Sequence, residues 1–154
     1  MPYLASIGTY LPCWGAPRHR VAGDDEDAIT LAVEAGRAAL IPGGAEVHDF
    51  FTGIELISYE DLGFAERFGA YKLVEAEVTS VGGALPVNPS GGLKAKGHPP
   101  RATGVAQCVE LFAQLRGEAA NQVDGARVAL AHNVGGPTAV SAVTILEGSA
   151  NGTR

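Results

Sequence analysis

Three histidines stand in sequence contexts where an imidazole could take part in acid–base chemistry. His98 closes a glycine-rich stretch, residues 89–99, while His48 lies within a strand-like segment and His132 directly follows one. An imidazole has an unperturbed pKa of about 6.5, so each ring could act as a general base or as a hydrogen-bond donor. Each histidine, taken alone, can also be read as a residue that only satisfies local hydrogen bonds.

The glycine-rich stretch and its flank also carry groups that could meet an anionic ligand. Ser90 and Gly91 open the stretch, Lys94 and Lys96 supply cations, and Arg101 follows it. An arginine could bind a carboxylate or a phosphate, or it could be a solvated side chain at a helix start, where a cation is unfavourable. The lysines could equally be solvated loop charges. Neither a phosphate-binding GxxxxGK[ST] loop nor a dinucleotide-binding GxGxxG pattern occurs.

Cys13 and Cys108 are the only thiols, which fits a reducing compartment better than a disulfide scaffold. Cys108 lies inside an apolar helical segment and reads as a small core residue. Cys13 ends the first strand-like segment beside Trp14 and is also interpreted as structural. The sequence therefore offers histidines for chemistry but no evident nucleophilic cysteine.

The 154 residues fit one domain, and 46% hydrophobic against 18% charged residues predicts a folded core. The net charge of -6, without a basic stripe, makes nucleic acid a poor candidate partner, and we expect none. No apolar run approaches the ~20 residues of a membrane span, and residues 1–12 lack the basic region of a signal peptide. We expect a cytoplasmic protein.

The elements that position these residues follow from periodicity and turn signals. Residues 52–63 open with a capping box of Thr52 and Glu55, residues 64–83 read as irregular, and residues 133–138 form a turn. Strands are predicted over residues 3–11, 46–51, 85–88, 127–131 and 140–146, and helices over residues 25–40, 52–63 and 102–116. This alternation predicts an α/β fold with a mixed five-stranded sheet, helices on both faces and antiparallel closing strands.

The helix over residues 102–116 is apolar nearly all round. Only Gln107, Glu110 and Gln114 would form a polar face. A helix of this kind is usually buried on several sides, so we expect a further layer above it, from a second copy or a partner. The alternative is a hydrophobic surface helix without a partner.

Three segments in this order resemble the C-terminal half of thiolases, most closely the sterol-carrier and lipid-transfer branch. They are His48-Asp49-Phe50-Phe51, residues 88–99 (NPSGGLKAKGHP) and residues 132–136 (HNVGG). The resemblance covers residues 45–148, whereas residues 3–40 look like the opening strand and helix of an N-terminal half of a thiolase or of a hydroxymethylglutaryl-CoA synthase. It implies one thiolase-type unit over residues 1–148, with parts 1–40 and 45–148, and a polar tail over residues 149–154.

The resemblance also implies roles for the histidines. His98 matches the Gly-His-Pro histidine that activates the family's acylated cysteine, and His48 matches a residue that holds a water of the oxyanion hole. Phe50 stands where the lipid-transfer branch often has its second cysteine, and His132 stands where other thiolases have theirs, with Val134 replacing a glycine. Nothing matches the nucleophile motif, so a thiol-dependent reaction would need another chain.

The function implied is binding of a coenzyme A thioester as substrate or ligand, with no tightly bound cofactor and no metal. Lys94, Lys96, Ser90, Gly91 and Arg101 are the expected contacts of this ligand, although the family usually has a small residue at position 101. We expect an acyltransferase or retro-aldol lyase subunit with His98, His48 and His132 as its catalytic candidates. The alternatives are a noncatalytic thiolase-like partner or scaffold subunit, and an inactive relic. A homodimer or a thiolase-like partner subunit is expected.

Overall fold

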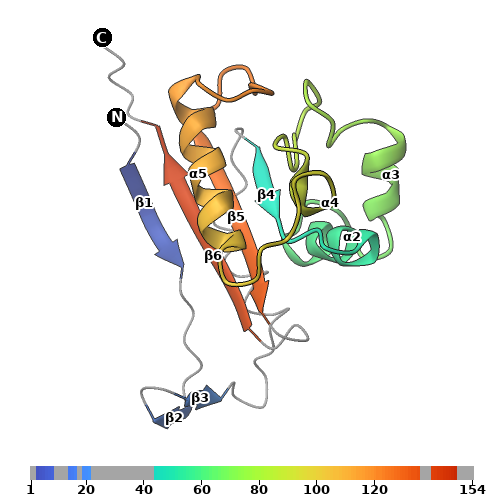
Figure 1. Ribbon diagram of the computed structural model, residues 1–154. Coiled ribbons are helices and arrows are strands. Elements are labelled where there is room, and N and C mark those ends of the chain that lie inside the picture. The colour runs from blue at the N-terminus through green and yellow to red at the C-terminus, as the bar shows by residue number, and fades with distance from the viewer. Residues whose placement is uncertain (1–2, 9–13, 17–18, 22–43, 136–139, 149–154) are drawn as a thin grey trace.

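A computed structural model describes residues 3–8, 14–16, 19–21, 44–135 and 140–148, the first three segments as backbone only. The main sheet consists, in spatial order, of β1 (Tyr3–Gly8), β6 (Val140–Glu147), β5 (Val128–Gly135) and β4 (Ala45–Val47) (Figure 1). The short strands β2 (Trp14–Ala16) and β3 (His19–Val21) form a separate antiparallel pair. The predicted helix over residues 25–40 lies outside the described residues.

The sheet is mixed, as predicted. β4 pairs with β5 in parallel, whereas β5 with β6 and β6 with β1 are antiparallel. The predicted strand over residues 85–88 is reduced to a single parallel bridge between Val87 and Ala45, so the described part of the sheet has four strands. The extended run stops there because Asn88 turns into the left-handed region, at φ 52°, and Pro89 has no N–H group to donate.

Four helices are described, and two of them were not predicted. They are α2 (Thr52–Asp61), α3 (Ala70–Glu75), α4 (Gly92–Lys96) and α5 (Thr103–Arg116). α3 lies in the segment read as irregular, and α4 lies inside the glycine-rich stretch. None of the helices in the described ranges is long and apolar enough to cross a membrane.

The predicted capping box at the start of α2 is wrong. Thr52 is the first helical residue, and no side chain caps the N-terminus. The Glu55 carboxylate is engaged elsewhere, since it accepts hydrogen bonds from the Tyr59 hydroxyl at 2.9 Å and from Asn88 Nδ2 at 3.2 Å. Glu55 therefore joins α2 to the segment that leads into the glycine-rich stretch.

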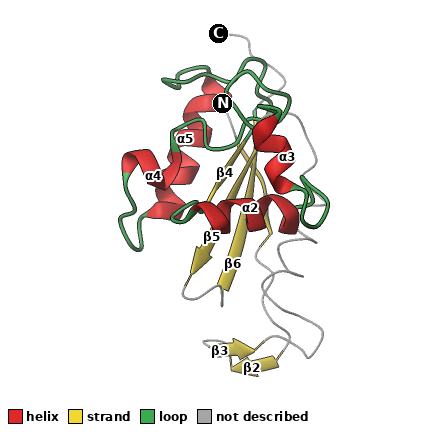
Figure 2. Ribbon diagram, turned by 90° about the vertical axis from the view of Figure 1, so that its right-hand side faces the viewer, coloured by secondary structure: helices red, strands yellow, loops and turns green. Residues whose placement is uncertain are grey.

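Helices cover both faces of the sheet, as predicted. Paired residues on neighbouring strands point to the same face, so the register divides the core into two clusters. On one face, Leu111 of α5 packs on Ala129, Ala131 and Leu146. On the other face, α2 and α3 contribute to a cluster of Ala45, Val47, Tyr59, Leu62, Ala70, Val87, Leu130 and Val143. Figure 2 shows α5 and α3 on opposite sides of the strands.

The orientation of α5 contradicts the predicted polar face. Gln107 and Gln114 are fully buried against the sheet and its adjoining loop, whereas Val105 and Val109 are 66% and 64% exposed. Gln107 Nε2 donates to the carbonyls of Glu46 and His132, and Gln114 Nε2 donates to that of Asn121. These bonds satisfy backbone groups that would otherwise be buried without partners, which outweighs the polarity pattern. The apolar back of α5 is thus open within the described structure.

Replacing Leu111 by Ala should lower the free energy of unfolding by about 2–5 kcal/mol, because its side chain is completely buried between α5 and the sheet. Val109→Ala, on the exposed side of the same helix, should change it by no more than about 0.5 kcal/mol. Urea denaturation of both variants measures this. Equal losses would contradict the orientation of α5 described above.

Candidate functional site

The three candidate histidines come together at the end of β4. His48 directly follows this strand, and Val47 pairs with His132 of β5, so the parallel register brings both residues to one edge of the sheet. The glycine-rich stretch returns over this edge and places His98 against His48. The ring centroids of His48 and His98 lie 4.9 Å apart with an interplanar angle of 83°.

Phe50 completes this cluster. Its ring centroid lies 5.1 Å from that of His48 and 5.9 Å from that of His98. The position that the sequence links to a missing second cysteine therefore contacts both imidazoles. In this chain an apolar ring occupies that place, beside both histidines, where a thiol would otherwise stand.

His48 and His132 are buried and electrically neutral near pH 7. Burial lowers the pKa of His132 to about 4, with a further contribution from the charge of His48. Burial, and then the charge of His98, also lowers the pKa of His48. His132 Nε2 lies 2.9 Å from Ser141 Oγ, and the Nδ1 atoms of His48 and His132 find no hydrogen-bond partner among the described residues. Both rings can therefore serve as uncharged donors or acceptors.

His98 differs from the other two because its side chain is exposed. Its Nδ1 lies 2.7 Å from Thr103 Oγ1, at the first residue of α5. Its Nε2 makes no hydrogen bond within the described structure. Among the three histidines, His98 is the one that a ligand could reach from solvent.

The buried Asp49 fixes the start of α4. Its Oδ1 accepts a hydrogen bond of 2.7 Å from the Leu93 backbone N–H. Gly92 stands in the left-handed region, at φ +64°, and a Cβ built there would lie 2.1 Å from Asp49 Oδ2. Only glycine lets the loop approach the carboxylate this closely.

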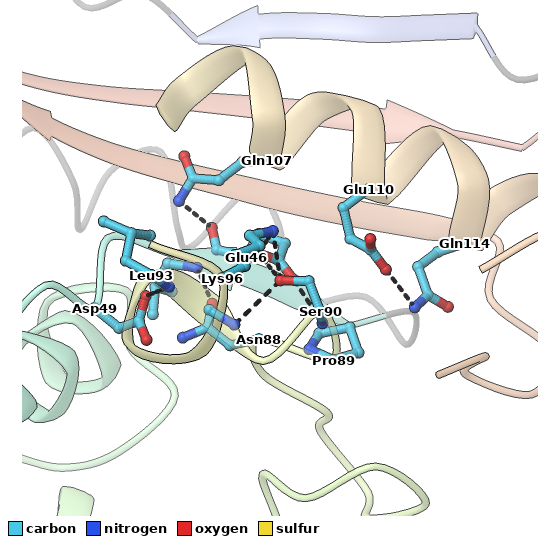
Figure 3. A network of polar contacts seen from close by, with 12 residues as sticks. Glu46, Asp49, Asn88, Pro89, Ser90, Leu93, Lys96, Gln107, Glu110 and Gln114 are labelled. Carbon is cyan, nitrogen blue, oxygen red and sulfur yellow. Dashed lines mark hydrogen bonds and ion pairs between the residues drawn. The ribbon is translucent and has the colours of Figure 1, made fainter. Parts of the chain in front are cut away.

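A second buried carboxylate, that of Glu46, holds the loop from the other side (Figure 3). It accepts hydrogen bonds from the Ser90 backbone N–H at 3.1 Å and the Ser90 hydroxyl at 2.8 Å, and Lys96 Nζ lies 3.4 Å away. Burial raises the pKa of Glu46, while Ser90 and Lys96 counteract this effect. Nearby, Val47 N–H donates to Asn88 Oδ1 at 2.8 Å. Several hydrogen bonds and one ion pair therefore hold the loop that precedes His98 against β4.

Several of the candidate ligand contacts already have hydrogen-bond or ion-pair partners within the protein. Lys94 pairs with Glu55, and Lys96 pairs with Glu46 and donates to Ser90 Oγ at 2.6 Å. Gly91, at φ +89°, uses its N–H for the Asn88 carbonyl. Their contact with coenzyme A stays a prediction, as does that of Arg101.

Arg101 borders a cavity of about 440 Å³ between the start of α5 and the strands β5 and β6. Its backbone is left-handed, at φ 73°, a conformation that is unfavourable for a residue with a Cβ atom. Thr103, the partner of His98, and Asn133 of β5 line the same cavity. The space therefore adjoins the histidine cluster.

The described thiol is not poised as a nucleophile. Cys108 is partly buried on α5, and burial raises its pKa, although a hydrogen bond with Thr144 counteracts this. A thiol with a raised pKa forms little thiolate at neutral pH. Cys13 lies outside the described residues.

Sequence reasoning missed the residues that hold the site together. Glu46, Asp49, Asn88, Thr103 and Gln107 all make the bonds described above. One signal was present, because a charged Glu46 between Ala45 and Val47 in a short strand predicts a buried carboxylate that needs partners. The roles of Thr103 and Gln107 depend on contacts that no local pattern encodes.

A family model described as "Thiolase C-terminal domain-like" matches residues 27–148. The chain belongs to this family. The match begins ahead of residue 45 and includes the whole site described above. This match confirms the resemblance to the C-terminal half of thiolases that the three motifs indicated.

Several curated proteins are similar to the chain. It is 48% identical over 130 residues to an acetyl-CoA acetyltransferase of Methanothermobacter thermautotrophicus, covering 79% of this chain and 34% of the relative. It is 56% identical over 91 residues to sterol carrier protein 2 of Bos taurus, covering 58% and 17%, respectively. It is 35% identical over 130 residues to the benzoylsuccinyl-CoA thiolase subunit BbsB of Thauera aromatica, covering 81% and 34%. The chain spans about a third or less of these relatives.

Among solved structures, the chain is similar to a chain of an Ltp2-ChsH2(DUF35) aldolase. The TM-score is 0.66 at 23% identity, covering 78% of this chain and 32% of that one. At this identity the likeness shows the fold, and it agrees with the mixed sheet flanked by helices.

Gly92→Ala should lower the free energy of unfolding by at least about 1–2 kcal/mol, because alanine is strained at this φ and its methyl group would displace Asp49. Gly53→Ala is the matched control, since no atom lies within 4 Å of a Cβ there and the residue lies in the first turn of α2. That variant should be neutral or slightly more stable. Denaturation curves that rank the two variants the other way would refute the role of Gly92.

His132 should make the stability depend on pH. Its pKa falls from about 6.5 in the unfolded chain to about 4, so its contribution is complete above pH 6.5 and is lost as the pH falls toward 4. This corresponds to about 3 kcal/mol. The stability difference between wild type and His132→Gln should therefore shrink by about 2–3 kcal/mol between pH 7.5 and pH 4.5.

The comparison with His132→Gln isolates this effect. Glu46, whose raised pKa works in the opposite direction, is present in both proteins and cancels in the difference. Denaturation at the two pH values measures both proteins. A difference that does not change with pH would show that His132 is not buried in its neutral form.

Proposed function

We propose that the chain binds a coenzyme A thioester and supplies the histidine side of a thiolase-like active site, in an acyltransferase or a retro-aldol lyase. The contact between His48 and His98 carries this proposal, with a buried neutral imidazole beside an exposed one. A carbonyl carbon under attack, or an enolate, needs hydrogen-bond donors for its oxygen and a base for proton transfer. This pair of rings supplies both kinds of group.

The chemistry that fits the described residues best requires no thiol. In a retro-aldol cleavage of a β-hydroxyacyl thioester, a base removes the hydroxyl proton and the Cα–Cβ bond breaks. The electron pair passes to the thioester carbonyl as an enolate, and a proton returned to Cα completes the reaction. His98 would be the base and His48 the donor to the enolate oxygen. The name of the aldolase that shares the fold agrees with this chemistry.

The acyltransferase reaction named for the archaeal relative would need a nucleophilic thiol in addition. Cys108 is unsuited to this role, since its pKa is raised and it lies on α5. In this version of the proposal a second chain brings the cysteine to His98.

The exposed back of α5 favours a second function that does not exclude the first. Val105, Val109 and Phe112 leave an apolar stripe open to solvent within the described structure. We infer that a second copy of the chain or a thiolase-like partner subunit covers this stripe. If that contact is the whole function, the chain is a noncatalytic partner or scaffold subunit.

His98→Ala should reduce cleavage of a β-hydroxyacyl-CoA by about 10²-fold or more, because the variant lacks the base. The measurement is release of the carbonyl product, with any partner subunit present. Arg116→Ala is the control, since Arg116 is exposed and pairs with Glu118 at the far end of α5. Binding of the thioester, followed by native mass spectrometry, should persist in both variants.

The same experiment separates the functions. Turnover that survives His98→Ala would overturn the catalytic assignment. A complex with bound thioester, no turnover and no dependence on His98 would support the scaffold function. Failure of the protein to bind any acyl-CoA, alone or with a partner, would overturn the proposal of a coenzyme A ligand.

A further inference from the structure

We infer that Thr103 is a positioning residue that holds His98 in the tautomer protonated at Nδ1, so that Nε2 is the basic nitrogen. The inference concerns the proton on one ring, and it relies on the proposed function only for what that nitrogen does. Its basis is two consecutive contacts, one of 2.7 Å between His98 Nδ1 and Thr103 Oγ1 and one of 3.2 Å between Thr103 Oγ1 and the carbonyl oxygen of Pro99.

The hydroxyl proton of Thr103 decides the arrangement. The Pro99 carbonyl can only accept a hydrogen bond, and Thr103 Oγ1 lies 3.2 Å from it. If the hydroxyl donated to His98 instead, two oxygen atoms with lone pairs would face each other across 3.2 Å with no proton between them. Donation to Pro99 removes this repulsion, and it is the usual bond of a threonine to the carbonyl four residues earlier.

With its only proton directed at Pro99, Thr103 Oγ1 can only accept from His98. The distance of 2.7 Å between Nδ1 and Oγ1 is that of a formed hydrogen bond. Nδ1 therefore carries the proton, and the neutral ring keeps its lone pair at Nε2. The geometry thus assigns a donor and an acceptor to both hydrogen bonds, with His98 Nδ1 donating to Thr103 Oγ1 and Thr103 Oγ1 donating to the Pro99 carbonyl.

The surroundings hold this arrangement in place. Thr103 is 4% exposed, so water does not compete for its hydroxyl, and it begins the 14-residue helix α5, whose Gln107 is anchored to the sheet. Pro99 also accepts a hydrogen bond from the Ala102 N–H at 3.0 Å, which fixes the carbonyl. Among the described residues no group bonds to His98 Nε2. The basic nitrogen is thus the free one, on an exposed ring next to His48.

The consequence for the proposed reaction is specific. A base must present a lone pair, and a ring in the other tautomer would present an N–H at the same position. Thr103 would act on the reaction without touching the substrate, by keeping the lone pair of His98 available. It would do for His98 what a second hydrogen-bonding group commonly does for a catalytic imidazole.

The test is the tautomer itself, read from long-range ¹H–¹⁵N correlations of the His98 ring at pH 8, where an ordinary imidazole is neutral. Wild type should show a protonated Nδ1 and an unprotonated Nε2. Thr103→Val keeps the shape but removes the acceptor, so signals of the Nε2-protonated form should appear. Thr103→Ser should restore the wild-type pattern. Thr144→Val, an equivalent change on the same cavity without contact to His98, should leave it unchanged.

Two results would overturn the inference: a wild-type ring protonated mainly at Nε2, or a Thr103→Val ring with the wild-type pattern. The wild-type spectrum decides the first point even if the valine variant does not fold. Because this measurement needs no substrate, it stands apart from the proposed function. A correct tautomer in a protein without turnover would refute the function and leave the role of Thr103 intact. With turnover, Thr103→Val should lower kcat about tenfold or more with KM unchanged.

Discussion

The site depends on two carboxylates that are buried at β4, those of Glu46 and Asp49. A buried carboxylate is unfavourable unless hydrogen bonds or opposite charges compensate for its lost hydration. The glycine-rich stretch provides these groups through Ser90, the Leu93 N–H and Lys96. The carboxylates at the end of β4 are stabilised by the glycine-rich stretch, and the hydrogen bonds to these carboxylates in turn fix the conformation of that stretch. His48 lies between the two carboxylates in the chain, and His98 follows directly on the segment that they fasten.

Differences in burial give three chemically identical side chains different properties. His48 and His132 lie where a positive charge is unfavourable, so their rings stay neutral and offer only hydrogen bonds. His98 remains in contact with solvent, and its environment leaves one nitrogen open. The ring of Phe50 lies beside both His48 and His98. The arrangement suits a reaction in which one ring moves a proton and its neighbour stabilises charge on oxygen.

Much of this could be predicted from the sequence, and the failures have clear physical causes. Periodicity identified α5, β5 and β6, because these elements are long and pack one face on a core. α4 was missed because it is held by Asp49 and contains glycine, so its stability is not local. Gln107 and Gln114 were assigned to solvent because polarity usually implies exposure, whereas here their amides satisfy buried backbone carbonyls. The family motifs predicted roles for the three histidines, but neither their arrangement around the end of β4 nor the proton position on His98 could be read from the sequence.

The parallel pairing of β4 with β5 has a consequence for how the protein folds. Ala45 pairs with Leu130, and every helix from α2 to α5 lies between them in the chain. Contacts between residues so distant in sequence form late and slowly, because a long loop must close before they are made. The edge that joins His48 to His132 can therefore close only after a long loop has been ordered. During synthesis, the edge of β4 that pairs with β5 stays unpaired until β5 has been made, and an unpaired strand edge is prone to aggregation.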